Sequence, residues 1–376
     1  MKLSLASAVV LCLATSTGFA QDTKKTAPPP PVLQVKYVGG IGVKVDYVPS
    51  EEVRKASPTP KMNLHTVASV PGTAKIYTGG TDGKIYLMDF KDNKKGPVSW
   101  NAHTGYVSSL ALAGKYLISA GSDHQLIWWD TETRTKVRSL EPHGKKWIRA
   151  VVATPDGKQF VSLGDDMIAR LWDTESAKPI HELIGHEKLT SAGLASKLHC
   201  CRFSPDGKRL ATGDQTGIAL IWDVASGKQI GKVHAPYVYT TNTNGFTYGG
   251  IRSLCFSPDG SLLALSGSIG GDIDNMAFSQ ALLQVYDWKT TKQTHEFLLK
   301  KNNCFLFGIH FHPKEPWIFA AAGSGESKIF LLDLKTQSVA QEIPATHGHF
   351  DMTLNESADQ LIAVGSGGAN LWELKR

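Results

Sequence analysis

The stretch FVSLGDDMIARLWD at residues 160–173 recurs along the chain with its key residues at matching places. It follows YLISAGSDHQLIWWD at residues 116–130 and precedes LATGDQTGIALIWD at residues 210–223. Each copy alternates apolar and polar residues, as half-buried β-strands do, and each ends on Trp-Asp. The pattern predicts a protein built from repeated short strands, with no long helix.

The residue that closes each copy recurs at intervals near 40 residues, which is the period of a β-propeller blade. Three copies also contain a Pro-Asp-Gly turn, at 155–157, 205–207 and 258–260. Proline presets φ in such a turn, and glycine accepts a positive φ. The seven closing residues are Asp89, Asp130, Asp173, Asp223, Asp287, Asp333 and Glu373.

With these motifs, residues 63–376 resemble the WD40 repeat family, in particular its exported bacterial members. The resemblance implies an all-β, seven-bladed propeller whose blades are four-stranded and antiparallel, with strands a to d running outward from the axis. The sequence stops soon after strand c of the seventh repeat, and in this family an N-terminal strand fills the vacant outer place. We expect that strand within residues 32–60, with Val43–Val48 as the leading candidate, so the propeller is assigned to 32–376.

The first 20 residues have the features of a signal peptide. Lys2 is followed by the apolar run Leu5–Ala14, and small residues at Gly18 and Ala20 suit cleavage after Ala20. Residues 21–31 are a polar, Pro-rich spacer. We therefore predict an exported protein, periplasmic or secreted, with no membrane span in its mature part.

The composition excludes several function classes. The net charge of +6 comes from scattered lysine pairs, so nucleic-acid binding is not predicted. Beyond Cys12 the chain has Cys200, Cys201, Cys255 and Cys304, none in a CxxC motif, which argues against a haem or zinc-ribbon site. Three disulfide pairings are open, and buried free thiols are favoured. We predict no cofactor, no metal and a monomer.

Serine, histidine and aspartate recur in the pattern of a nucleophilic triad, but the set occurs twice with matching spacing. The resemblance implies a structural role instead, in which each set and a tryptophan form a buried hydrogen-bond chain. Repeat four has Thr216 where that aspartate is expected, which predicts a weaker network there. The two predicted tetrads are His103, Ser119, Asp123 and Trp129 in repeat two, and His143, Ser162, Asp166 and Trp172 in repeat three.

Long connections mark the functional face. His186 to Leu198 spans twelve residues where His103 to Val107 spans four. In an antiparallel meander the d–a and b–c loops leave on one face, and long loops on a rigid scaffold are usually functional, although neutral drift is the alternative. The longest d–a loop, 235–250, is aromatic and uncharged, which favours recognition, and Asp272-Ile273-Asp274 lacks the glycine of a calcium loop.

Residues at the start of strand a point toward the same face, and the resemblance implies that they contact partners. The resemblance adds Thr81, Ser122 and Asp165, from the b–c turns, and Ser108 also starts a strand a. The predicted partner-binding residues are Arg149, His199, Arg252, Phe307, Tyr237, Tyr239, Phe246, Tyr248, Asp272 and Asp274.

Three hypotheses for function follow from these patterns. The first is a non-enzymatic exported scaffold that binds a protein or peptide through the d–a/b–c loop face of blades 4 and 5. The second is a carbohydrate or cell-surface polymer binder, because aromatic rings stack on sugars and polar loop residues bind hydroxyls. The third is an enzyme acting at the central channel, for which His199, Arg252 and Asp165 are too sparse to define a reaction.

Overall fold

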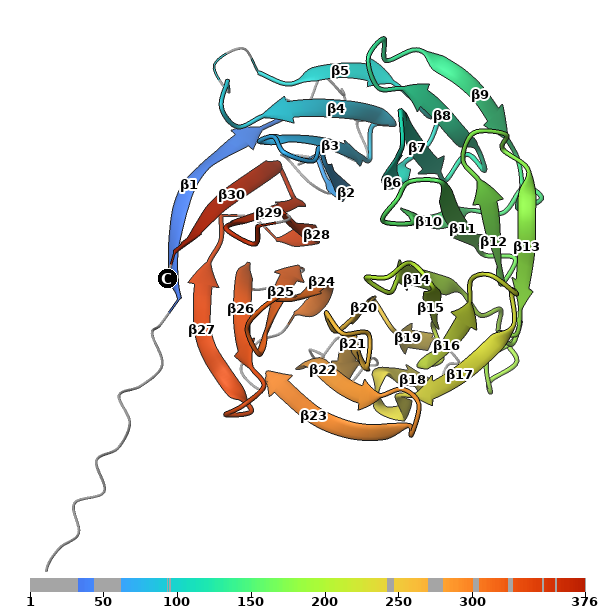
Figure 1. Cartoon of the computed structure of the whole chain (residues 1–376), viewed down its shortest axis with the longest axis vertical. Coiled ribbons are helices and arrows are strands. Elements are labelled where there is room, and N and C mark those ends of the chain that lie inside the picture. The colour runs from blue at the N-terminus through green and yellow to red at the C-terminus, as the bar shows by residue number, and fades with distance from the viewer. Residues whose placement is uncertain are drawn as a thin grey trace, which may run out of the picture. The chain divides into compact units, whose positions relative to one another are not determined.

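Seven four-stranded antiparallel sheets are arranged as blades around a common axis in the computed structural model (Figure 1). The structure describes residues 33–43, 62–92, 94, 96–241, 247–269, 280–299, 304–323, 327–346, 348–355 and 357–375. Gln34–Lys375 form one compact unit. The predicted all-β, seven-bladed propeller is confirmed. The predicted signal peptide (1–20) and spacer (21–31) lie outside the described residues.

Each blade runs outward from strand a beside the axis to strand d at the rim, in sequence order in six blades and with β1 as the rim strand of the seventh (Figure 1). The seven a strands are β2 (Leu64–Ser69), β6 (Val107–Ala113), β10 (Ile148–Ala153), β14 (Leu198–Phe203), β20 (Ser253–Phe256), β24 (Phe305–Phe311) and β28 (His349–Leu354). The b strands are β3 (Lys75–Gly80), β7 (Tyr116–Gly121), β11 (Gln159–Gly164), β15 (Arg209–Asp214), β21 (Leu262–Ile269), β25 (Trp317–Gly323) and β29 (Gln360–Gly365).

The outer half of each blade consists of strands c and d. The c strands are β4 (Lys84–Asp89), β8 (Leu126–Asp130), β12 (Ile168–Asp173), β16 (Ile218–Asp223), β22 (Gln280–Asp287), β26 (Lys328–Asp333) and β30 (Gly368–Lys375). The d strands are β5 (Val98–Asn101), β9 (Lys136–Leu140), β13 (Pro179–Ile184), β17 (Gln229–His234), β23 (Lys292–Leu299), β27 (Ser338–Pro344) and β1 (Gln34–Gly42).

The core lies between neighbouring blades, because strands b and c are buried on both faces. Trp128 of β8 is fully buried, and its ring meets that of Phe160 in the next blade edge-on at a centroid distance of 5.4 Å. The indole N–H of Trp128 donates to the backbone carbonyl of Thr174, also in the next blade. Such contacts repeat around the ring, so each blade is stabilised by its two neighbours.

The last blade is closed by β1, which pairs antiparallel with β30 from Gln34↔Lys375 to Gly42↔Gly368. The prediction of an N-terminal closing strand is confirmed, but Val43–Val48 as the leading candidate is wrong, and residues 44–48 lie outside the described part. A rim strand has one solvent-exposed edge and needs no regular apolar alternation. Instead Gly40 lets the backbone approach Asn370, whose Oδ1 would lie 2.7 Å from an added Cβ.

The d–a loop between β17 and β20 carries structure of its own. A 3-10 turn, η2 (Pro236–Val238), leads into a two-stranded hairpin of β18 (Tyr239–Thr241) and β19 (Thr247–Gly249). Within the described ranges, no helix is both long and apolar enough to cross a membrane.

Candidate functional site: the mouth of the central channel

Six of the seven a strands are irregular at the same place. Pairing with strand b skips one residue, for example Arg149 between Ile148 and Ala150 of β10. A β-bulge of this kind frees one residue from the ladder and redirects its side chain. Arg252 occupies the matching place just before β20, where its N–H donates to the carbonyl of Ser266. The residues skipped in the other blades are His65, Ser108, His199, Phe307 and Phe350.

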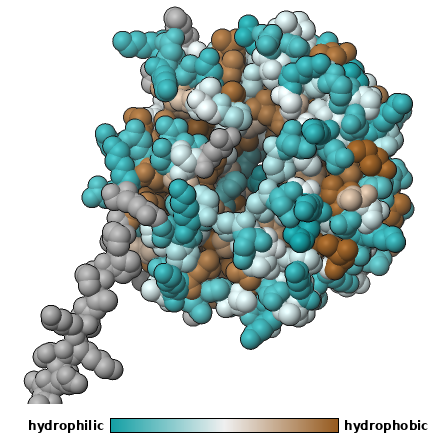
Figure 2. Space-filling view, viewed as in Figure 1, coloured by the Kyte–Doolittle hydropathy of each residue, from teal (hydrophilic) through white to brown (hydrophobic). Residues whose placement is uncertain are grey.

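These seven positions, one from each blade, converge at one end of the central channel. Together with two d–a loop residues, they line a cavity of about 300 Å³, here called the mouth. The opening at the centre of the ring is visible in Figure 2. The nine lining residues are His65, Tyr106, Ser108, Trp147, Arg149, His199, Arg252, Phe307 and Phe350.

Four of the predicted partner-binding residues, Arg149, His199, Arg252 and Phe307, therefore lie together. Sequence reasoning missed His65 and Phe350 because the first and seventh repeats are degenerate. The signal that could have found them is their place directly after the buried first residue of strand a, Leu64 or His349.

Aromatic rings follow one another around more than half of the mouth. Phe307 meets Phe350 at a centroid distance of 5.5 Å, and Phe350 meets His65 at 5.2 Å. His65 then lies 6.2 Å from Tyr106, which lies 6.3 Å from Trp147. This aromatic arc, His65, Tyr106, Trp147, Phe307 and Phe350, gives the mouth a continuous apolar wall.

A guanidinium group lies at each end of the aromatic arc. Arg149 stacks over Trp147 at 4.0 Å and makes a bidentate ion pair with Asp165, with N–O distances of 2.7 and 2.9 Å. Arg252 lies 5.6 Å over the ring of Phe305, which in turn is 5.9 Å from Phe307. The two arginines thus differ, because Arg149 has a carboxylate partner within the described chain and Arg252 has none.

His199 lies between the two arginines in blade order, and its Nε2 is buried without a hydrogen-bond partner among the described residues. The Nε of Arg252 is buried and unpartnered in the same way. Burial, followed by the nearby Arg252 and Arg149, holds the pKa of His199 well below its usual value, so this imidazole is neutral at neutral pH. Burial, followed by the charge of Arg149, also lowers the pKa of Arg252. Buried polar atoms without partners are rare in proteins, and both of these residues line the mouth.

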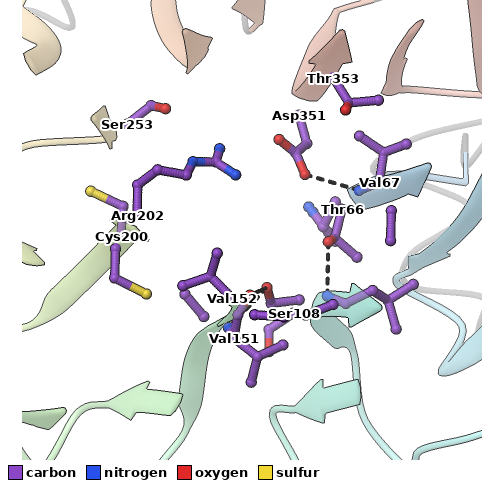
Figure 3. Close-up of a pocket in the computed structure, with 18 of the residues that line it drawn as sticks. Thr66, Val67, Ser108, Val151, Val152, Cys200, Arg202, Ser253, Asp351 and Thr353 are labelled. Atoms are coloured by element: carbon purple, nitrogen blue, oxygen red, sulfur yellow. Dashed lines mark hydrogen bonds between the residues drawn. The ribbon is translucent and has the colours of Figure 1, made fainter. Parts of the chain in front are cut away.

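A second cavity of about 390 Å³ shares the seven converging positions of the mouth and extends along the a strands to Arg202 and Asp351. Their charged ends point toward one another from β14 and β28, on opposite sides of the cavity (Figure 3). Burial raises the pKa of Asp351 to about 6, against the opposing effects of Arg202 and of two backbone N–H donors. Cys200 also lines this cavity, and burial raises its thiol pKa.

The serine, histidine and aspartate sets form closed hydrogen-bond chains away from the channel. In repeat two, His103 Nδ1 lies 2.8 Å from Asp123 and Nε2 lies 2.8 Å from Ser119 Oγ. The indole N–H of Trp129 donates to the same Oγ at 2.9 Å. His143, Ser162, Asp166 and Trp172 repeat this arrangement at 2.9 Å for each of the three contacts. Both serines are 0% exposed, so no substrate reaches either hydroxyl.

Blade 4 contains a third complete tetrad, which corrects one prediction. Asp214, not Thr216, takes the aspartate role, with its Oδ2 2.8 Å from His186 Nδ1. Thr212 accepts the indole N–H of Trp222 at 2.9 Å and lies 2.8 Å from His186 Nε2. Thr216 instead donates to Asp214 through its backbone and hydroxyl, so this network is complete rather than weakened.

Comparison with protein families gives four matches to the WD domain, G-beta repeat (WD40), at residues 97–130, 134–173, 177–223 and 238–273. The protein is a seven-bladed propeller that contains WD40 repeats. The first three matches begin in or beside the d strand of one blade and end at the c strand of the next, so sequence repeat and blade are offset. The comparison with curated proteins found no match.

The remaining predicted residues of this propeller are not among those that line the mouth. Tyr237, in η2, is 61% exposed, and Tyr239 begins β18. Tyr248 lies in β19, but its side chain is not described. Phe246, Asp272 and Asp274 lie outside the described residues.

Metal binding and thiol reactivity are two further kinds of chemistry to consider in the described chain. Among its residues, no group of three or more His, Cys, Asp or Glu side chains could hold a metal ion. Cys200, Cys201, Cys255 and Cys304 are not joined by disulfides. Burial raises the thiol pKa to about 12 in Cys201 and in Cys255, so these two are poor nucleophiles at neutral pH.

Proposed function

We propose that the protein is an exported, non-enzymatic scaffold that binds a protein or peptide partner on the d–a/b–c loop face of blades 4 and 5. The mouth of the channel opens on that face and anchors the partner. The observation that carries this proposal is the convergence of one residue from every blade on a cavity that contains buried, unpartnered donors. WD40 propellers commonly mediate protein interactions, which supports a role in binding a protein partner.

Exposed apolar side chains in the d–a loops support a protein partner. Leu189 and Leu194 precede β14 and are 59% and 41% exposed, and Tyr237 precedes β20 and is 61% exposed. Tyr106, at the rim of the mouth, is 46% exposed. Exposed apolar groups around a pocket are typical of interaction surfaces, because their burial contributes binding energy.

The test is affinity capture from the native envelope fraction with the purified mature chain as bait. The double variant Leu189→Ser/Tyr237→Ala should lose the partner while its melting temperature stays unchanged. The matched control is Val98→Ser/Ile230→Ser, which removes two comparably exposed side chains from the d strands β5 and β17. If the loop variant still captures the partner while the control variant loses it, the partner does not bind on the proposed face.

Export is tested separately. Expression in a bacterial host with an intact secretion system should give a mature protein whose N-terminal residue is Gln21, found in the periplasm or medium. A cytoplasmic protein that keeps Met1 would contradict this part of the proposal.

A further inference from the structure

We propose that the mouth binds a carboxylate attached to an aromatic residue, as found at a C-terminal Phe, Tyr or Trp of the partner. This inference rests on the proposed function, because it names the chemistry by which the anchored partner is recognised. It follows from the division of the mouth into a cationic part and an aromatic part.

The cationic part comes from blades 3 to 5 and consists of Arg149, His199 and Arg252. The aromatic arc comes from blades 6, 7, 1 and 2 together with Trp147. None of the nine lining residues is acidic, and Asp165, which approaches the rim, is already bound by Arg149. A cationic ligand would therefore meet positive charge without a free carboxylate, whereas an anion is attracted.

Arg252 is the group available to pair with that anion. Its guanidinium makes no ion pair within the described chain, and its buried Nε lacks a partner. His199 adds a second donor through Nε2 when that atom carries the proton of the neutral ring. A carboxylate accepts from both groups at once, and charge-assisted hydrogen bonds of this kind are about twice as strong as neutral ones.

The aromatic arc selects what is attached to the carboxylate. Phe307 and Phe350 contact each other with their rings tilted by 59°, and both line the mouth with Arg252, so a third ring can pack against them. A cavity of about 300 Å³ is at the small end of ligand pockets, which fits one residue rather than a folded segment. A chain end combines ring and carboxylate in one residue, and no further chain has to continue beyond the mouth.

The first experiment compares two probes that differ only in charge, N-acetyl-phenylalanine and its amide. Binding to the mature chain is measured by saturation-transfer NMR and calorimetry. The acid should bind saturably, and the amide should bind at least about tenfold more weakly because the amide cannot form the ion pair. N-acetyl-alanine, which keeps the carboxylate and lacks the ring, should also bind more weakly. Equal binding of acid and amide, or binding of neither, would overturn the proposal.

Variants then place the binding at the mouth. Arg252→Gln should weaken binding of the acid at least about tenfold, and Arg252→Lys should retain part of the affinity. The matched control is Arg209→Gln, because Arg209 also lies 5.6 Å over an aromatic ring, that of Trp288, but follows an a–b turn on the opposite face. Unchanged binding in Arg252→Gln would also overturn the proposal, and if that variant fails to fold, the comparison of acid and amide on the natural chain decides it.

The two proposals fail in different ways. If Arg252→Gln loses N-acetyl-phenylalanine but still captures the partner, the mouth takes carboxylates yet does not anchor this partner. If the loop variant loses the partner while the acid binds neither chain, the interaction face stands and the chemistry assigned to the mouth is wrong.

Discussion

Asp351, on the a strand of the last blade, accepts a 2.9 Å hydrogen bond from the backbone N–H of Val67, on the a strand of the first. Its other oxygen accepts the N–H of Met352 at 2.8 Å. At the same seam the hydroxyl of Ser366 donates to Asn63 at 2.8 Å. The two ends of the repeat array are therefore joined by side chains near the axis as well as by β1 at the rim.

Asp351 should make stability depend on pH. Its pKa is about 6 in the folded protein against 3.8 ordinarily, so between these values the folded state holds the proton more tightly. Its favourable contribution is complete below about pH 4 and is lost as the pH rises through about 6. Arg202 is the charged group facing it, and nearby His310 is neutral here because burial lowers its pKa to about 3.

The measurement is the difference in melting temperature between Asp351→Asn and the natural chain. Only the natural residue ionises, so the natural chain alone loses stability as the pH rises. The melting temperature of the variant relative to that of the natural chain should therefore increase by about 2 °C or more from pH 4 to pH 8. Thr353→Ala, at the same seam, should give a difference that does not vary with pH. A flat or falling difference for Asp351→Asn would contradict the raised pKa.

Asp214 should be essential to blade 4. Asp214 is 1% exposed, and Asp214→Ala leaves His186 and two backbone N–H donors without their acceptor, so the free energy of unfolding should fall by about 2 kcal/mol or more. Thr216→Ala removes one hydroxyl donor and should cost less than about 1 kcal/mol. Urea unfolding measures both, and a larger effect at Thr216 would reverse the assigned roles.

Closure by β1 can be tested with two neighbouring glycines. A Cβ at Gly40 would meet Asn370 Oδ1 at 2.7 Å and the Tyr37 hydroxyl at 2.9 Å, whereas one at Gly39 meets nothing within 4 Å. Gly40→Val should therefore separate β1 from β30 and lower the melting temperature by several degrees, while Gly39→Val changes it little. Limited proteolysis should cut the first variant faster near its N-terminus. Equal behaviour of the two variants would argue against this closing strand.

Asp165 should limit the affinity of the mouth for anions. Asp165→Asn removes the carboxylate that occupies Arg149, which leaves a second guanidinium free to attract the ligand. Binding of N-acetyl-phenylalanine should tighten about threefold or more by calorimetry. Asp206→Asn, which releases Arg209 on the opposite face, is the matched control and should have no effect. Weaker binding in Asp165→Asn would indicate that the ion pair positions Arg149 for the ligand.

Much of the architecture could be predicted because the blade period and the Trp-Asp endings are local patterns. The closing strand could not be chosen correctly from alternation, because Val43–Val48 alternates more regularly than the glycine-containing β1. Asp214 was missed because it lies two places after Thr212, whereas the aspartates of the other two tetrads lie four places after their serines. A residue at either place in the b–c turn can reach the histidine. Hydrogen-bond geometry decides between them, and spacing does not.

The site was only partly predictable for a related reason. Arg149, His199, Arg252 and Phe307 were found as residues at the start of strand a, but the bulges that aim three of them into one cavity leave no mark in the sequence. The pairing of Arg149 with Asp165, which distinguishes it from Arg252, depends on distances across a blade. Residue type alone therefore gave a set of candidates, while the structure gave their different roles.

The repeated bulge also bears on how such a molecule can change. A residue left out of the ladder contributes little to strand pairing, so each of the six bulged positions at the mouth can be exchanged with little damage to its own sheet. Specificity at this opening can then drift, or be redesigned, one blade at a time. Different combinations of residues at these positions can therefore give the mouth different ligand selectivity while the fold stays the same.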